Sequence, residues 1–168
     1  NSSNTIEQII EDEKGDIYGI LQKSAQTSGS GIVLYNQLKD EFTTFGVNTK
    51  LAKLLNVTAD KMLLVSSYSS KLNQLQLFNK NNQSIEQLPI ATGFVYAAMK
   101  WRERVWLSTE KLGLISLNVE TGEWDRLAES TPEKIKGLFL TTDENKVLLN
   151  IKKELYELIS ITGGKINK

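Results

Sequence analysis

The chain contains no cysteine and no histidine, and these two absences exclude much of ordinary protein chemistry. Without cysteine there is no disulfide and no thiolate nucleophile. Without histidine there is no catalytic triad with a histidine base, and the usual zinc sites are excluded as well. The lack of cysteine fits an exported bacterial protein as well as a cytosolic one, so it does not indicate a compartment.

The sequence also lacks long hydrophobic runs and an excess of either charge. Hydrophobic residues make up 40% of the 168 residues, enough for one sizeable core, but their runs are too short and too interrupted to span a bilayer. Twenty basic residues balance twenty acidic ones, so neither nucleic acid nor an anionic membrane is an expected partner. The first residues, NSSNTIEQ, do not have the pattern of a signal peptide.

What the sequence does contain is a repeat of about 43 residues. Each of four copies has a polar turn just before a short apolar strand, and the equivalent positions are 45, 43 and 42 residues apart. These first anchors are Ile17, Met62, Val105 and Val147. A second anchor follows in each copy, with steps of 43, 39 and 44 residues, at Asn36, Asn79, Asn118 and Thr162. Two anchors with one period are typical of propellers and related arrays.

Each copy has the pattern of short strands. Residues 135–161 divide into three runs rich in Ile, Leu and Val, which predicts strands joined by hairpins. The third copy adds a fourth strand, EWDRL, after the glycine-containing turn VETG. Four antiparallel strands in such a repeat make a propeller blade.

We therefore expect an all-β fold of about four four-stranded blades that form one propeller segment over residues 1–168. The expected blades cover residues 5–46, 50–89, 94–128 and 135–168. A pair of β-sandwiches is the alternative. Since the last copy stops early, we expect this segment to be part of a larger propeller. Its terminal faces would then be covered by further blades or by a second chain, and a homodimer is expected.

One copy also resembles a known repeat. The stretch RVWLSTEKLGLISLNVETGEWDRL resembles the two-component regulator propeller repeat, and EDEKGDIYG is similar to the start of such a repeat. The residues that match the pattern are Trp106, Thr109, Gly113, Leu114, Asn118, Thr121, Gly122 and Trp124. Trp106 and Trp124 are also expected to belong to the core, because they lie at strand positions where other copies have Leu and Phe.

The resemblance implies a ligand-sensing function. Propellers of this family form the extracytoplasmic part of membrane-bound hybrid histidine kinases and perceive oligosaccharides. It implies a non-enzymatic sensor on the periplasmic or extracellular side of a membrane-anchored bacterial protein, with an oligosaccharide as ligand and no cofactor. Any kinase would lie in other domains, because this chain has no histidine to accept a phosphate. The alternatives are a generic protein-interaction propeller and a propeller glycoside hydrolase that uses carboxylates such as Glu110, Asp125 or Glu157.

The candidate ligand-binding residues are Trp101, Arg102 and Arg104. Alignment of the copies places them at the tip of a hairpin, where the other copies have DEKG, TADK and DENK. An aromatic side chain is unusual there, and Trp and Arg are enriched at binding hot spots. Three interpretations remain open: Trp101 packs on a neighbouring blade or covers a dimer contact, it contacts another protein, or it contacts a ligand.

A run of acidic residues raises a second possibility. Glu11, Asp12, Glu13 and Asp16 surround Gly15 and provide the carboxylates that calcium prefers. The run lacks the alternating spacing of an EF-hand loop and aligns with the hairpin turns of the other copies. We therefore expect a hairpin turn and no metal site.

Overall fold

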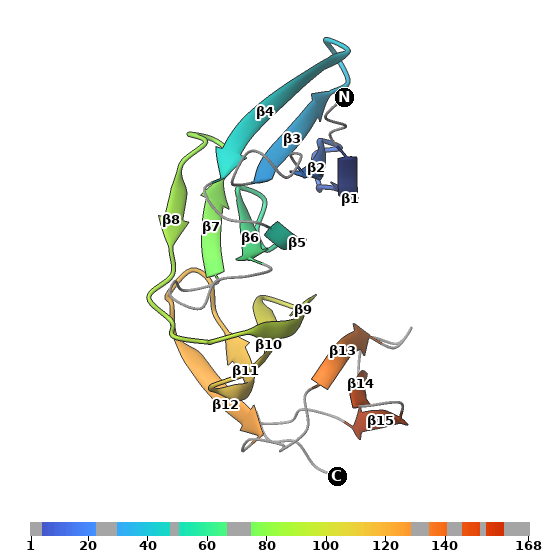
Figure 1. Cartoon of the computed structure of the whole chain (residues 1–168), viewed down its shortest axis with the longest axis vertical. Helices are drawn as coiled ribbons and strands as arrows, with labels where there is room; N and C mark the ends of the chain where they lie inside the picture. Colours follow the sequence, from blue (N-terminus) through green and yellow to red (C-terminus); the bar gives the residue numbers. More distant parts are fainter. Residues whose placement is uncertain are drawn as a thin grey trace. The chain divides into compact units, whose positions relative to one another are not determined.

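The computed structural model describes residues 5–22, 30–47, 51–66, 75–128, 135–140, 146–151 and 154–159. Within these residues every regular element is a strand, and the strands form four antiparallel sheets (Figure 1). The all-β prediction is confirmed. The chain divides into two compact units, Asn1–Leu88 and Pro89–Lys168, and each unit contains two of the sheets.

The first unit contains sheets 1 and 2, in which each strand pairs with the next one along the chain. Sheet 1 consists of β1 (Thr5–Glu11), β2 (Ile17–Gln22), β3 (Ser30–Asn36) and β4 (Glu41–Val47). Sheet 2 consists of β5 (Leu51–Asn56), β6 (Lys61–Ser66), β7 (Leu75–Asn79) and β8 (Ile85–Gln87).

The second unit contains sheets 3 and 4 with the same neighbour-to-neighbour pairing. Sheet 3 consists of β9 (Val95–Trp101), β10 (Arg104–Thr109), β11 (Gly113–Leu117) and β12 (Trp124–Ala128). Sheet 4 has three described strands, β13 (Ile135–Leu140), β14 (Lys146–Ile151) and β15 (Glu154–Ile159).

The first anchor of the repeat occupies the same place in every sheet. Each anchor lies on the second strand and pairs with the last or next-to-last residue of the first strand. The pairs are Ile17 with Glu11, Met62 with Asn56, Val105 with Lys100, and Val147 with Leu140. The sequence period therefore corresponds to one four-stranded structural unit.

The second anchor is an asparagine that caps the turn between the third and fourth strands. The side-chain oxygen of Asn79 accepts hydrogen bonds from the N–H groups of Asn81 (2.9 Å) and Asn82 (3.3 Å). Asn36 and Asn118 do the same in sheets 1 and 3. This local side-chain bonding is why asparagine is favoured in turns. Thr162, the fourth anchor, lies outside the described residues.

A bulge at a corresponding place in the first strand is a third repeated feature. The pairing with the second strand skips one residue in β1, β5, β9 and β13. The skipped residues are Glu7, Ala52, Tyr96 and Lys136. Bulges bend a strand and redirect a side chain, so these four residues depart from the alternation of their strands.

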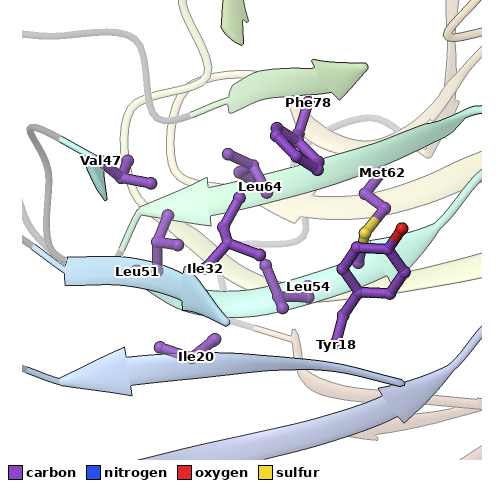
Figure 2. Packing of buried hydrophobic residues seen from close by; sticks show 9 residues of the cluster. All are labelled: Tyr18, Ile20, Ile32, Val47, Leu51, Leu54, Met62, Leu64 and Phe78. Atoms are coloured by element: carbon purple, nitrogen blue, oxygen red, sulfur yellow. The ribbon is translucent and has the colours of Figure 1, made fainter. Parts of the chain in front are cut away.

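Sheets 1 and 2 pack face to face around one apolar cluster (Figure 2). It consists of Tyr18, Ile20, Ile32, Val47, Leu51, Leu54, Met62, Leu64 and Phe78. Each large side chain buried here contributes roughly 1.5–3 kcal/mol by leaving water. Side-chain amides add polar contacts between the sheets, since Gln8 both donates to the carbonyl of Leu54 (3.0 Å) and accepts from its N–H group (2.9 Å).

Sheets 3 and 4 share a second apolar cluster. It consists of Met99, Trp101, Trp106, Leu114, Leu127, Ile135, Leu138 and Val147. Trp106 is 1% exposed, which confirms its prediction as a core residue. The same prediction is wrong for Trp124, which is 39% exposed, because it lies on β12, a strand that pairs only with β11 and so has a neighbour on one side.

Candidate functional site

The candidate residues Trp101, Arg102 and Arg104 lie where sequence alignment places them, at the β9–β10 hairpin. Trp101 ends β9 and pairs with Arg104 at the start of β10, so the loop between them has two residues, Arg102 and Glu103. The hairpin brings the three side chains close together in sequence and space, but they have different roles.

Trp101 is a core residue. Its side chain is only 9% exposed, and its ring meets that of Trp106 edge to face, with the centroids 5.1 Å apart. Such aromatic pairs contribute about 0.5–1.5 kcal/mol beyond their buried area. Its cluster also includes Ile135 and Leu138 of sheet 4. Packing on the neighbouring sheet, one of the three interpretations left open, therefore accounts for this tryptophan.

Arg104 is engaged within its own sheet. Its guanidinium donates hydrogen bonds to the side-chain oxygen of Ser116 (2.6 Å) and to the carbonyl oxygen of Ser116 (2.9 Å). It also forms an ion pair with Asp125 on β12 (2.8 Å). Arg104 thus ties together three strands, and its side chain is about one-third exposed.

Arg102 is the most accessible of the three. Its guanidinium carbon lies 4.8 Å from the centroid of the Trp101 ring, close enough for a cation–π contact. Its backbone has φ of 55°, a conformation that costs a non-glycine residue roughly 1–3 kcal/mol. The corresponding hairpin of sheet 1 has glycine, Gly15, at positive φ. Arg102 therefore occupies a conformation that glycine would adopt at lower cost.

This hairpin can offer an exposed guanidinium to a ligand but not an open aromatic platform. Arg102 contacts the Trp101 ring, and the rest of that ring is buried. Arg104 donates to partners inside the sheet. The assignment of these residues as a ligand site remains a prediction, and Arg102 is the residue that it now depends on.

The acidic run forms the turn between β1 and β2. One carboxylate oxygen of Asp12 accepts hydrogen bonds from the N–H groups of Lys14 (2.9 Å) and Asp16 (3.0 Å). The other lies 2.7 Å from the ammonium group of Lys80 in sheet 2. Among the described residues, no group of three or more acidic, histidine or cysteine side chains has the arrangement of a metal site.

The environment of Asp12 lowers the pKa of its carboxyl group. Burial raises this pKa, but the hydrogen bonds from Lys80 and from the N–H groups of Lys14 and Asp16 lower it by more. The pKa of Asp12 is therefore lowered from its usual value of 3.8. Tyr18, whose ring lies 5.4 Å from the Lys80 ammonium, has a pKa raised to about 12, mainly by burial. Asp12 therefore remains ionised next to Lys80 at neutral pH.

Two of the carboxylates considered for a hydrolase, Asp125 and Glu110, have partners within their own sheet. Asp125 is ion-paired with Arg104, and one oxygen of Glu110 accepts a hydrogen bond from the N–H group of Phe94 (3.0 Å). The backbone of Glu157 lies on β15, and its side chain is outside what the structure describes. A glycosidase needs two carboxyl groups placed across one bond, and both Asp125 and Glu110 are engaged by partners within the protein.

Sequence reasoning missed two features. Lys80 follows the Asn79 anchor and looks like an ordinary turn residue, because its partner Asp12 is 68 positions away. Phe94 and Tyr96 have rings 5.6 Å apart and nearly parallel, and Phe94 is 37% exposed. Their spacing of two residues at the start of a strand was the available signal, but it is also the spacing of two core residues on one face.

Comparison with known proteins supports the fold. No protein-family model and no curated protein sequence matches the chain. Among solved structures, it is similar to the extracellular domain of a protein described as a hybrid two-component system from B. thetaiotaomicron. The identity is 16% and the TM-score 0.69, over 96% of this chain and 21% of that one.

Two other solved structures show the range of the likeness. An auxiliary nutrient binding protein from Bacteroides ovatus matches with 11% identity and a TM-score of 0.68, over 90% of this chain and 38% of that one. The β-propeller domain of Cps50 (Swd1) from Myceliophteria thermophila matches with 12% identity and a TM-score of 0.67, over 94% of this chain and 53% of that one.

These comparisons show that the sheets are β-propeller blades, as predicted. The resemblance to extracellular domains of two-component systems is also found in three dimensions. The chain spans about a fifth of the length of those domains. In the described part of the chain, no helix is long and apolar enough to cross a membrane.

Proposed function

We propose that this chain is a ligand-sensing propeller segment of a bacterial two-component regulator, on the periplasmic or extracellular side of the membrane. The observation that carries the proposal is the structural likeness to an extracellular domain of such a system, which extends over 96% of the chain. The similarity to a nutrient binding protein favours a small extracellular solute as ligand. An oligosaccharide is the ligand class that the sequence resemblance implies.

The proposal does not assign a reaction to the segment. The solved structures that it resembles include an extracellular domain of a two-component system, a nutrient binding protein and a β-propeller domain. The candidate carboxylates Glu110 and Asp125 hold backbone or side-chain partners in their own sheet. We therefore propose a binding role, with any kinase activity in other domains of the full protein.

The gene provides the first test. Beyond the part that encodes this segment, the gene is expected to encode a transmembrane segment followed by a histidine kinase. A reading frame that encodes only further propeller blades and no membrane anchor would contradict the sensor function. It would favour the alternative of a protein-interaction propeller.

Binding measurements test the candidate residue. Arg102→Gly removes the guanidinium and places glycine where φ is positive, so the variant should fold at least as well as the wild type. If Arg102 contacts the ligand, Arg102→Gly weakens binding in calorimetric titrations with oligosaccharides. Arg126→Ala, which removes an exposed arginine from the same sheet, serves as the charge-matched control. Equal binding by both variants would exclude Arg102 from the site.

A further inference from the structure

An exposed pair of aromatic rings lies at the beginning of sheet 3, at the opposite end of β9 from the Trp101 hairpin. The rings of Phe94 and Tyr96 are 5.6 Å apart with 26° between their planes. Phe94 is 37% exposed and Tyr96 is half-buried. An aromatic side chain that is left partly in water gives up part of the free energy that its burial would provide.

The blade itself does not require an aromatic residue at Tyr96. Tyr96 is the bulged residue of β9, and its counterparts in the other sheets are Glu7, Ala52 and Lys136. All three counterparts are exposed, and they differ in size and charge. The position therefore tolerates any of these side chains, and the bulge directs the Tyr96 ring towards Phe94.

The backbone that presents the two rings is held on both sides. The N–H group of Phe94 donates to a carboxylate oxygen of Glu110 (3.0 Å), and its carbonyl accepts from the N–H group of Glu110 (2.7 Å). The carbonyl of Thr92, a fully buried residue, accepts from the N–H group of Lys111 (3.0 Å). These bonds join the segment before β9 to the β10–β11 turn.

Gly93 makes the close approach of these two segments possible. It has φ of 65°, and a Cβ atom there would lie 2.8 Å from a carboxylate oxygen of Glu110 and 2.9 Å from the side chain of Lys111. Only glycine meets both requirements. The position of Phe94 is therefore fixed before any ligand arrives, which lowers the entropic cost of binding.

Trp101 and Phe94 differ in what they offer to a ligand. Trp101 is buried and contacts Arg102, whereas Phe94 keeps more than a third of its surface in water. Two exposed side chains of opposite charge, Glu110 and Lys111, lie on the turn bonded to the Phe94 segment. The site thus combines a partly exposed aromatic pair with a hydrogen-bond acceptor and a donor.

We propose that Phe94 and Tyr96, with Glu110 and Lys111, form a binding site for a neutral saccharide. The C–H groups on the apolar face of a sugar ring are attracted to the electron-rich face of an aromatic ring. The hydroxyl groups around the sugar then pair with the carboxylate of Glu110 and the ammonium group of Lys111. This inference rests on the proposed sensor function, whose ligand class it shares. What it adds is the location of the site, at the opposite end of β9 from the Trp101 hairpin.

A titration with oligosaccharides, observed by NMR spectroscopy, tests the site directly. Maltohexaose, cellohexaose, xylohexaose and mannohexaose are added separately, each to about 10 mM, so that a site with a millimolar Kd is well occupied. At least one of them is expected to shift the ring resonances of Phe94 and Tyr96. Phe94→Leu, which keeps an apolar side chain but removes the ring, should weaken that binding about tenfold. Tyr96→Leu is the second variant and should also weaken it.

The matched control is Phe139→Leu in sheet 4. Phe139 is 50% exposed on β13, so it is also an exposed phenylalanine, but it lies outside the proposed site. Its substitution should leave binding unchanged. If an oligosaccharide binds and neither Phe94→Leu nor Tyr96→Leu weakens it, this site is wrong and the sensor function still holds. If none of the four oligosaccharides shifts any resonance, the saccharide site is overturned, and the gene beyond the segment decides the sensor function separately.

Discussion

The ammonium group of Lys80 lies 2.7 Å from a carboxylate oxygen of Asp12, and this ion pair links the β7–β8 turn of sheet 2 to the β1–β2 turn of sheet 1. The two side chains are only 4% and 1% exposed. Lys80 also donates to the carbonyl of Ala59, so its charge is well compensated. The pair connects two sheets at the same interface as the apolar cluster of Figure 2.

Removal of one partner should be costly. We expect Lys80→Met to lower the free energy of unfolding by about 3 kcal/mol, because Asp12 would remain as a buried charge without its cation. Urea denaturation at pH 7 gives this value. The control is Lys14→Met, since Lys14 pairs with Asp60 and both side chains are about half exposed. Solvent screens that exposed pair, so Lys14→Met should cost much less than Lys80→Met. Equal losses in the two variants would contradict a special role for the buried pair.

The ion pair also makes stability depend on pH. Because the pKa of Asp12 is lower in the folded chain than its usual value of 3.8, Asp12 stabilises the fold above that value. The stabilisation is lost as the pH falls from about 4 towards the lower folded pKa, since the unfolded chain then binds the proton more readily. Thermal melts between pH 3 and 6 should show this loss, and Asp12→Asn should reduce it. Asp60 also has a lowered pKa, so part of the slope should remain.

The turns after the third strands allow a stabilising substitution. The fourth residue after each asparagine anchor has positive φ, and these residues are Asp40 (53°), Gln83 (60°) and Gly122 (75°). Glycine adopts this conformation without steric cost, so Gln83→Gly should raise the free energy of unfolding by about 0.5–1 kcal/mol. Gly122→Ala should lower it by about 1 kcal/mol. A lower melting temperature for Gln83→Gly would show that contacts of the Gln83 side chain outweigh the backbone strain.

Much of the fold could be predicted from the sequence because strand formation and turn capping are local. The anchors Ile17 and Asn36 recur with one period, and the structure places each set at one location in its sheet. The prediction that Trp124 is buried was wrong, because the position of a residue within a strand does not show which strand lies at the edge of a sheet. Two residues with the same local pattern, Trp106 and Trp124, are 1% and 39% exposed.

The interactions between sheets could not be predicted in the same way. Alignment places Trp101 and Asp12 at equivalent positions, each following the residue that pairs with the first anchor. One of them packs in an apolar cluster and the other forms a buried ion pair. The sequence identifies the position, but the chemistry depends on a partner far along the chain, such as Lys80 for Asp12.

Several apolar side chains lie exposed on the face of sheet 1 that does not pack on sheet 2. Cross-strand pairing places Ile9, Gly19, Val33 and Thr44 in one row on this face. The face also includes Ile6 and Phe42, and the exposed fractions are 43% for Ile6, 67% for Ile9 and 66% for Phe42. Apolar surface on the order of several hundred Å2, at about 25 cal/mol per Å2, favours pairing by several kcal/mol before the cost of association.

We propose that a second copy of the chain covers this face, as expected from the sequence. Size-exclusion chromatography with light scattering should then show a dimer at high micromolar concentration. Ile9→Lys places a charge in the middle of the face and should give a monomer. Leu38→Lys should remain a dimer, since Leu38 is 99% exposed but lies in the β3–β4 turn and not on the face. A wild-type chain that stays monomeric over the same range would show that the exposed face of sheet 1 does not mediate self-association.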